Sequence, residues 1–182
     1  LACRQQVVRL FDRYDDRIRP ILGTLRASVL HQDGNDNNII VDPQDPARIC
    51  GIIDFGDMSF GRTINELAIV LAYALLDATD IYAAARAVIE GYVSEFPLEE
   101  SEAETLYDLM RMRLVASICI SSRQSTKHPE NAYLMVSQAP AMALLARLDQ
   151  IVPEFMVSLF RRAAGFPATP AQVAVTEHLA LA

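Results

Sequence analysis

The sequence predicts a mainly helical fold with one small β-hairpin, which is an α+β class. Apolar residues recur at helical spacing along most of the 182 residues, and two short runs rich in β-branched residues flank a turn. Hydrophobic residues make up 52% of the chain, enough for one buried core. We therefore expect one domain over residues 1–165, followed by a linker and a marginal terminal helix over residues 166–182.

The first predicted elements are a helix and the hairpin. Residues 3–22 carry apolar residues at helical spacing and should form a helix that ends near Pro20. The runs "NIIVD" (38–42) and "RICGIID" (48–54) have the composition of strands, and two Asp-Pro steps between them indicate a turn. The two strands should therefore pair as an antiparallel hairpin.

The rest of the chain should be helical. Thr63 with Glu66, and Ser101 with Glu104, have the spacing of capping boxes at two helix starts. Pro140 should kink or break the helix that contains it. The expected helices cover residues 63–77, 80–96, 101–123, 130–151 and 153–165.

Charge and composition exclude several classes of function. The net charge is −7 and the 16 basic residues are scattered, so no nucleic-acid surface is indicated, whereas a cationic small substrate would suit this balance. The longest apolar run, residues 67–76, is too short to cross a membrane, and no secretion signal is visible. Cys3, Cys50 and Cys119 lie far apart in apolar surroundings, which predicts reduced core residues in a cytoplasmic protein.

Two polar clusters flank the predicted hairpin. "HQDGNDNN" (31–38) precedes the first strand, and "IDFGD" (53–57) follows the second. A hairpin folds its ends together, so Asp33, Asn38 and Asp54 should approach one point. Carboxylates gathered there would repel one another unless a cation intervenes, and oxygen ligands of this kind favour Mg²⁺. The pattern therefore favours metal-assisted phosphoryl transfer.

The same residues carry a resemblance to a known family. "HQDGNDNN" resembles the H-x-D-x-x-x-x-N catalytic loop of protein-kinase-like enzymes, and "IDFGD" resembles their metal-binding D-F-G segment, in the form typical of the aminoglycoside phosphotransferase and choline kinase superfamily. Further likeness over roughly residues 25–150 is most similar to hydroxylysine kinases and to the phosphotransferase module fused to class III aminotransferases. The resemblance implies the C-terminal lobe of a protein-kinase-like fold.

The resemblance also implies a role for each matching residue. Asp33 would accept or orient the proton of the substrate hydroxyl, while Asn38 and Asp54 would hold Mg²⁺ at the phosphates of ATP. Three supporting residues are implied as well: His31, which would steady the loop, Asp57, which would help to place substrate or metal, and Glu66, which would tie down the loop backbone.

Simpler interpretations stay open at these positions. A solvated turn rich in Asp and Asn would explain the residue types of the first cluster, and turn formation or helix capping would explain Asp57 and Glu66. Asn35, Asp36 and Asn37 are expected to form turns rather than to bind ligands.

The sequence departs from the family pattern in two places. Gln32 replaces the usual Gly between His31 and Asp33, and a positive φ there would strain it by about 1–2 kcal/mol. No Gly-rich strand turn or strand lysine precedes residue 31, so the N-terminal lobe that covers ATP is expected to be absent. Apolar surface left by that lobe could drive formation of a homodimer. Arg113 lies on the long predicted helix, where it could face an anionic group, but a surface position is expected.

The expected activity of the full gene product is transfer of the γ-phosphoryl group of ATP to a hydroxyl of an amino alcohol or aminoglycoside-like substrate, with Mg²⁺ as cofactor. This fragment alone should be inactive. Its partners would be the small hydroxyl acceptor, the N-terminal lobe and a fused aminotransferase module. The alternative is a degenerate, non-catalytic kinase-like binding module within a larger multidomain protein.

Overall fold

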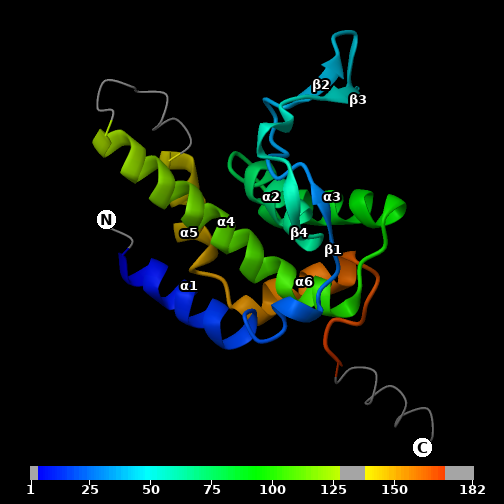
Figure 1. Ribbon diagram of the computed structural model, residues 1–182. Helices are drawn as coiled ribbons and strands as arrows, with labels where there is room; N and C mark the ends of the chain where they lie inside the picture. Colours follow the sequence, from blue (N-terminus) through cyan, green and yellow to red (C-terminus); the bar gives the residue numbers. More distant parts are fainter. Residues whose placement is uncertain (1–3, 128–137, 171–182) are drawn as a thin grey trace, which may run out of the picture.

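Helix α4 (Glu100–Lys127) is the central helix, and four of the other described helices pack against it (Figure 1). The computed structural model describes residues 4–127 and 138–170. Helix α3 (Ile81–Glu95) packs against α2 (Ile64–Ala74) and α6 (Pro153–Ala163). The helices in contact with α4 are α1 (Arg4–Arg17), α2 (Ile64–Ala74), α5 (Gln138–Leu148) and α6 (Pro153–Ala163). The predicted α+β class with a mainly helical body is confirmed.

Within residues 4–127 and 138–170, four strands form two separate antiparallel ribbons, and one ribbon lies between the two strands of the other in the sequence. The predicted hairpin is confirmed as β2 (Ile39–Asp42) paired with β3 (Asp45–Ile52), and it projects from the helical body in Figure 1. The second ribbon, β1 (Ala27–Leu30) paired with β4 (Ser59–Arg62), was not predicted. Its strands have the sequences "ASVL" and "SFGR", which are too short and too mixed to give a strand signal.

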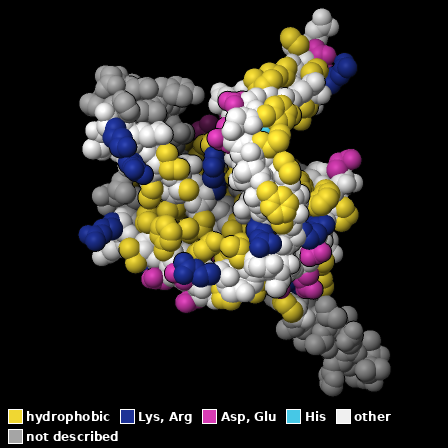
Figure 2. All heavy atoms as spheres, in the orientation of Figure 1, with side chains coloured by type: hydrophobic (Ala, Val, Ile, Leu, Met, Phe, Trp, Pro, Cys, Tyr) yellow, Lys and Arg dark blue, Asp and Glu magenta, His cyan; other side chains and the backbone are white. Residues whose placement is uncertain are grey.

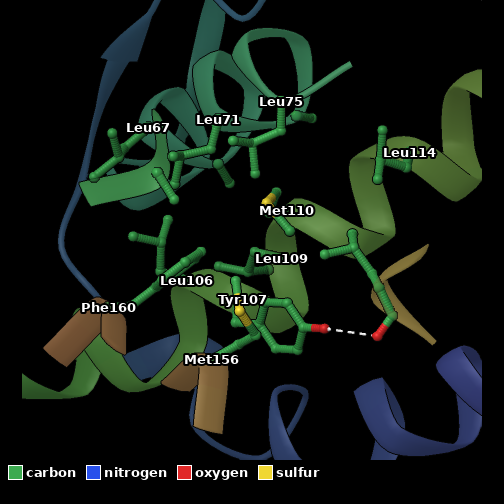
Figure 3. Packing of buried hydrophobic residues seen from close by; sticks show 14 of the residues in the cluster. Leu67, Leu71, Leu75, Leu106, Tyr107, Leu109, Met110, Leu114, Met156 and Phe160 are labelled. Carbon is green, nitrogen blue, oxygen red and sulfur yellow. Dashed lines mark hydrogen bonds between the residues drawn. The ribbon is translucent and has the colours of Figure 1, made fainter. Parts of the chain in front are cut away.

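All six described helices contribute to the core, and Figure 3 shows the part between α2, α4 and α6. Leu67, Leu71 and Leu75 recur every four residues, so they form one stripe that meets Leu106 and Met110 of α4. On the other side of α4, Tyr107 packs edge-to-face against Phe160 of α6, with ring centroids 5.7 Å apart. The apolar residues whose spacing predicts these helices are therefore the residues that fill the core.

Both predicted capping boxes are wrong, because neither pair of side chains bonds to the backbone of its helix start. Thr63 precedes α2, but its hydroxyl bonds to the Ser28 hydroxyl at 2.9 Å and caps no backbone group. At the start of α4, the carboxylate of Glu102, not that of Glu104, accepts a hydrogen bond from the backbone N–H of Glu99 at 2.9 Å. The spacing of a capping box shows which contacts are sterically available, and tertiary partners decide which ones form.

Other predictions meet a mixed outcome. Cys50 is exposed on the hairpin and Cys119 is half-buried, so the prediction of core cysteines is wrong for Cys50, while both thiols are free. Cys3, the predicted helix over residues 130–137 and the predicted terminal helix over residues 171–182 lie outside the described residues. Within the described residues no helix is long and apolar enough to cross a membrane.

The buried hydroxyl of Tyr107 gives a test of the core. Burial is the main cause that raises the pKa of Tyr107 from 10.0 to about 12. Its neutral form stabilises the fold below pH 10, and the unfolded chain loses the proton first as the pH rises toward 12. The free energy of unfolding should therefore fall by about 1.4 kcal/mol per pH unit in that window relative to Tyr107→Phe.

Urea denaturation of both proteins at several values of pH measures this difference. The exposed Tyr82→Phe is the matched control. A gap between wild type and Tyr107→Phe that stays constant from pH 9 to pH 12 would contradict the prediction.

Candidate functional site

The two polar segments lie between the two ribbons. Leu30 pairs with Ser59 where the β1–β4 ribbon ends, and Ile39 pairs with Ile52 where the β2–β3 ribbon begins. Residues 31–38 and 53–58 connect these pairs, so they must run side by side. The Ile53 N–H donates to the Asn38 carbonyl at 2.9 Å, which joins the two segments directly. The predicted proximity of the two clusters is confirmed at the level of the backbone.

His31 links the segments through its side chain. Its Nδ1 accepts a hydrogen bond from the Asp33 backbone N–H at 3.3 Å, so Nε2 carries the proton and donates to the Ile53 carbonyl at 2.8 Å. The imidazole also meets the Phe55 ring edge-on, with centroids 5.0 Å apart. Both ring nitrogens are therefore engaged within the site.

The carboxylate of Asp33 accepts hydrogen bonds on both oxygens. Asn38 Nδ2 donates to Oδ2 at 2.9 Å, and Arg113 Nη2 donates to Oδ1 at 3.2 Å. The same Arg113 nitrogen also donates to the Tyr73 hydroxyl at 3.0 Å. The Arg113 side chain is only 27% exposed, so the prediction of a surface arginine is wrong. Eighty residues separate it from Asp33, and no local pattern signals such a contact.

Asn38 and Asp54 have the groups that a magnesium ion needs. Asn38 is 7% exposed, and its amide nitrogen donates to both the carbonyl and the carboxylate of Asp33, which leaves its amide oxygen with no donor among the described residues. Asp54 is exposed, and its Oδ1 accepts a 3.3 Å hydrogen bond from the Gly56 N–H. Mg²⁺ takes one or two protein oxygens and fills its other positions with water and phosphate oxygens. The residues fit this cation.

The wider set of acidic residues does not form a protein-only metal cage. Within the described residues there is no group of three or more His, Cys, Asp or Glu side chains placed to hold a metal ion. Asp57 is exposed at the end of the short 3-10 turn Phe55–Asp57. A shared metal site of Asn38 and Asp54 beside Asp33 stays a prediction.

Gln32 has a positive φ of 67°, which is the condition under which its side chain strains the loop. Two hydrogen bonds offset this strain. The Gln32 backbone N–H donates to Glu66 Oε2 at 3.1 Å, and its Nε2 donates to the Ser59 hydroxyl at 2.6 Å. Glu66 thus ties the loop backbone to α2, and Gln32 itself ties the loop to β4.

The middle of the loop is a turn that rests on α2. The Asn37 N–H donates to Asn35 Oδ1 at 2.9 Å, as expected of a turn former. Gly34 is buried against α2, where a Cβ would lie 2.9 Å from Val70 Cγ2 and 3.5 Å from Glu66 Oε1. Only glycine allows this close approach of loop to helix.

Comparison with known proteins identifies the family. A model of the phosphotransferase enzyme family matches residues 1–102, more than half of the chain. The chain belongs to this family. The likeness that "HQDGNDNN" and "IDFGD" carry is thereby confirmed.

Curated relatives of this phosphotransferase-family chain are hydroxylysine kinases. The protein from Danio rerio is 34% identical over 151 residues, 81% of this chain and 42% of the relative. The Xenopus laevis protein is 31% identical over 86% of this chain and 44% of the relative, and the Mus musculus protein 32% over 73% and 36%. The chain spans less than half the length of these relatives. No solved structure gives a significant match.

Substitutions at Gln32 test the strain in the loop. Gln32→Gly and Gln32→Ala both lose the side-chain hydrogen bond to Ser59, but only the glycine variant relieves the positive φ. We expect the glycine variant to be more stable by about 1 kcal/mol, although alanine ordinarily has the advantage in the unfolded chain. Chemical denaturation measures the difference, and an alanine variant of equal or greater stability would contradict the strain.

A double-mutant cycle tests the contact between loop and α2. Gly34→Ala places a methyl group against Val70 and should cost about 1–3 kcal/mol of unfolding free energy. Val70→Ala makes room, so the double variant should be more stable than the sum of the single changes predicts. Gly23→Ala is the control, because a Cβ there meets no atom within 4 Å. Additive effects of the two changes would refute the contact.

Proposed function

We propose that this chain carries the catalytic loop and the metal-binding segment of an ATP-dependent kinase that phosphorylates a hydroxyl of a small amine-bearing acceptor. The observation that carries the proposal is the joint placement of residues 31–38 and 53–58 between two ribbons. Membership of the phosphotransferase family supports it. The name of the relatives, hydroxylysine kinase, points to an acceptor that carries both a hydroxyl group and an amino group.

Asp33 is the proposed base. It would accept the proton of the acceptor hydroxyl as the hydroxyl oxygen bonds to the γ-phosphorus and the bond from that phosphorus to the bridging oxygen of ADP breaks. Asn38 and Arg113 hold the two carboxylate oxygens and so fix the direction in which the base faces. Such positioning matters because a misplacement of about 1 Å can cost on the order of 10²-fold in rate.

Asn38 and Asp54 are the proposed ligands of Mg²⁺. When bound, the ion would neutralise charge on the nucleotide phosphates, which is its usual contribution to phosphoryl transfer. His31 would keep the two ligand-bearing segments together through the Ile53 carbonyl and the Asp33 N–H. Asp57 would serve as a further polar group at the exposed edge of the site.

The strands around the site support the proposal that another part of the longer protein covers them. Figure 2 shows hydrophobic side chains over the projecting ribbon. Phe60 is 74% exposed, and Val29, Ile49, Phe55 and Met58 are exposed to a lesser degree. An N-terminal lobe that covers ATP would bury this surface.

A non-catalytic binding module is the second candidate, and the strained Gln32 favours it. Gln32 has a positive φ and lies directly before the proposed base in residues 31–38. The hydrogen bonds of Gln32 to Glu66 and Ser59 favour the enzyme, because they hold the loop in place despite the strain. Measured turnover decides between the two functions.

Substitution of the two aspartates in the full-length protein tests the proposed function. With ATP, Mg²⁺ and 5-hydroxylysine as acceptor, Asp33→Asn should lower kcat by about 10²–10⁴-fold because proton acceptance is lost. Asp54→Ala should abolish turnover because a ligand of the metal is removed. A coupled assay of ADP release measures both.

Asp36→Asn is the matched control, since Asp36 is an exposed residue of the same loop. It should keep the wild-type rate. Turnover like that of wild type in Asp33→Asn or in Asp54→Ala would remove the role given to that residue. A wild-type protein that phosphorylates no hydroxyl acceptor would favour the binding module.

A further inference from the structure

The side chain of Gln32 extends the contact between β1 and β4 beyond the last backbone pair of their ribbon. That ribbon lies between the helical body and the projecting β2–β3 ribbon (Figure 1), and it ends where Leu30 pairs with Ser59. Gln32 follows this pair by two residues, yet its Nε2 donates to the Ser59 hydroxyl at 2.6 Å. The loop therefore stays attached to β4 after backbone pairing has stopped.

Gly61 leaves the space that the Gln32 side chain occupies. Ser59 and Gly61 are two residues apart on β4, so they face the same side of the strand. A Cβ at Gly61 would lie 3.2 Å from Gln32 Nε2 and 3.4 Å from Leu30 Cδ1, closer than the usual separation of heavy atoms in contact. β4 thus offers the amide of Gln32 both a hydrogen-bond acceptor and the room to reach it.

The backbone of Gln32 is held from another direction. Its N–H donates to Glu66 Oε2 at 3.1 Å on α2, while φ stays at 67°. A residue other than glycine keeps such a conformation only where its surroundings impose it. The backbone contact with α2 and the side-chain contact with β4 together fix residue 32, and Asp33 is the next residue along the chain.

The hydrogen bond between Gln32 and Ser59 attaches the two polar segments at a second place. Among the described residues, the hydrogen bonds that join residues 31–38 directly to residues 53–58 all end at Ile53. Ser59 immediately follows the second segment, so its contact with Gln32 lies away from Ile53 along the chain. Two points of attachment restrict a rotation of one segment against the other that a single point would allow.

We infer that Gln32 is a positioning residue, which through Ser59 sets the distance between the proposed base Asp33 and the proposed metal ligand Asp54. Groups that react must be held in place by neighbours whose own side chains are fixed, and Gln32 is fixed by both its backbone and its amide. This inference rests on the proposed function. It gives the strained residue a role in catalysis, whereas the binding module gives it none.

Two variants break the hydrogen bond in different ways. Ser59→Ala removes the hydroxyl from an exposed position of β4. Gln32→Asn keeps the amide and suits a positive φ, but its side chain lacks the methylene group needed to reach Ser59. In the full-length protein, with ATP, Mg²⁺ and 5-hydroxylysine, each should lower kcat about 10-fold because the base is misplaced. The KM for ATP and the KM for the acceptor should each stay within about twofold of wild type.

Three measurements separate positioning from a structural role. The double variant Gln32→Asn/Ser59→Ala should be no slower than either single variant, because both changes remove the same contact. Ser59→Ala added to Asp33→Asn should leave the residual rate unchanged, because the distance to a lost base has no effect. The Tm of Gln32→Asn should stay close to that of wild type, because relief of strain offsets the lost hydrogen bond.

Two further variants serve as a rescue and a control. Ser59→Thr keeps the hydroxyl and should recover most of the rate that Ser59→Ala loses. Ser94→Ala is the matched control and should keep the wild-type rate. Ser94 is exposed, and its hydroxyl donates to the Gly91 carbonyl within α3.

Each contrary result has a defined meaning. A wild-type kcat in both Ser59→Ala and Gln32→Asn would overturn the inference. So would losses that multiply in the double variant, a further loss in the Asp33→Asn background, a fall in kcat that follows a lower Tm, or a Ser59→Thr variant as slow as Ser59→Ala. All of these results leave the proposed function in place. A wild-type protein that phosphorylates no hydroxyl acceptor would instead overturn the proposed function, and the inference with it.

Discussion

The pairing of two nested ribbons is the constraint on which the site depends. β1–β4 and β2–β3 fix both ends of residues 31–38 and 53–58, so the two polar segments have little freedom to separate. A slip of one residue in either ribbon would turn side chains to the opposite face. The hydrogen bond from Ile53 to Asn38 and the ring of His31 then hold the segments in contact. Any reaction that uses side chains from both segments therefore depends on the pairing of the two ribbons.

Backbone strain is concentrated at the same place. Gln32 and Asp54 are the only non-glycine residues with a positive φ in the described part of the chain, and each lies on one of the two segments. Such conformations cost about 1–3 kcal/mol each and persist where the surroundings impose them. For Gln32 the surroundings are Glu66 and Ser59. For Asp54 the strained turn leaves its carboxylate exposed beside the Gly56 N–H. Strain of this kind is typical of functional sites.

Local patterns in the sequence predict the helices, the β2–β3 hairpin and the proximity of the two polar clusters, because each depends on neighbours along the chain. They miss β1–β4, whose strands pair only because the hairpin between them brings their ends together. They miss the role of Arg113, which meets Asp33 across 80 residues. They also assign Thr63 and Glu66 to a helix cap, although Ser28 and Gln32 are the actual partners. What escapes prediction is the set of long-range polar contacts.

Helices α2 and α4 each contribute residues both to the hydrophobic core and to the site. On α2, Glu66, Val70 and Tyr73 are spaced i, i+4 and i+7, so they share the face toward the loop. Leu67 and Leu71 directly follow Glu66 and Val70 in the sequence, and together with Leu75 they form the core stripe. On α4, Arg113 immediately precedes the buried Leu114. Apolar packing of α2 and α4 therefore positions the Glu66 carboxylate that holds Gln32 and the Arg113 guanidinium that holds Asp33. Because the core is closely packed, a change that moved either helix in the core would also displace these side chains.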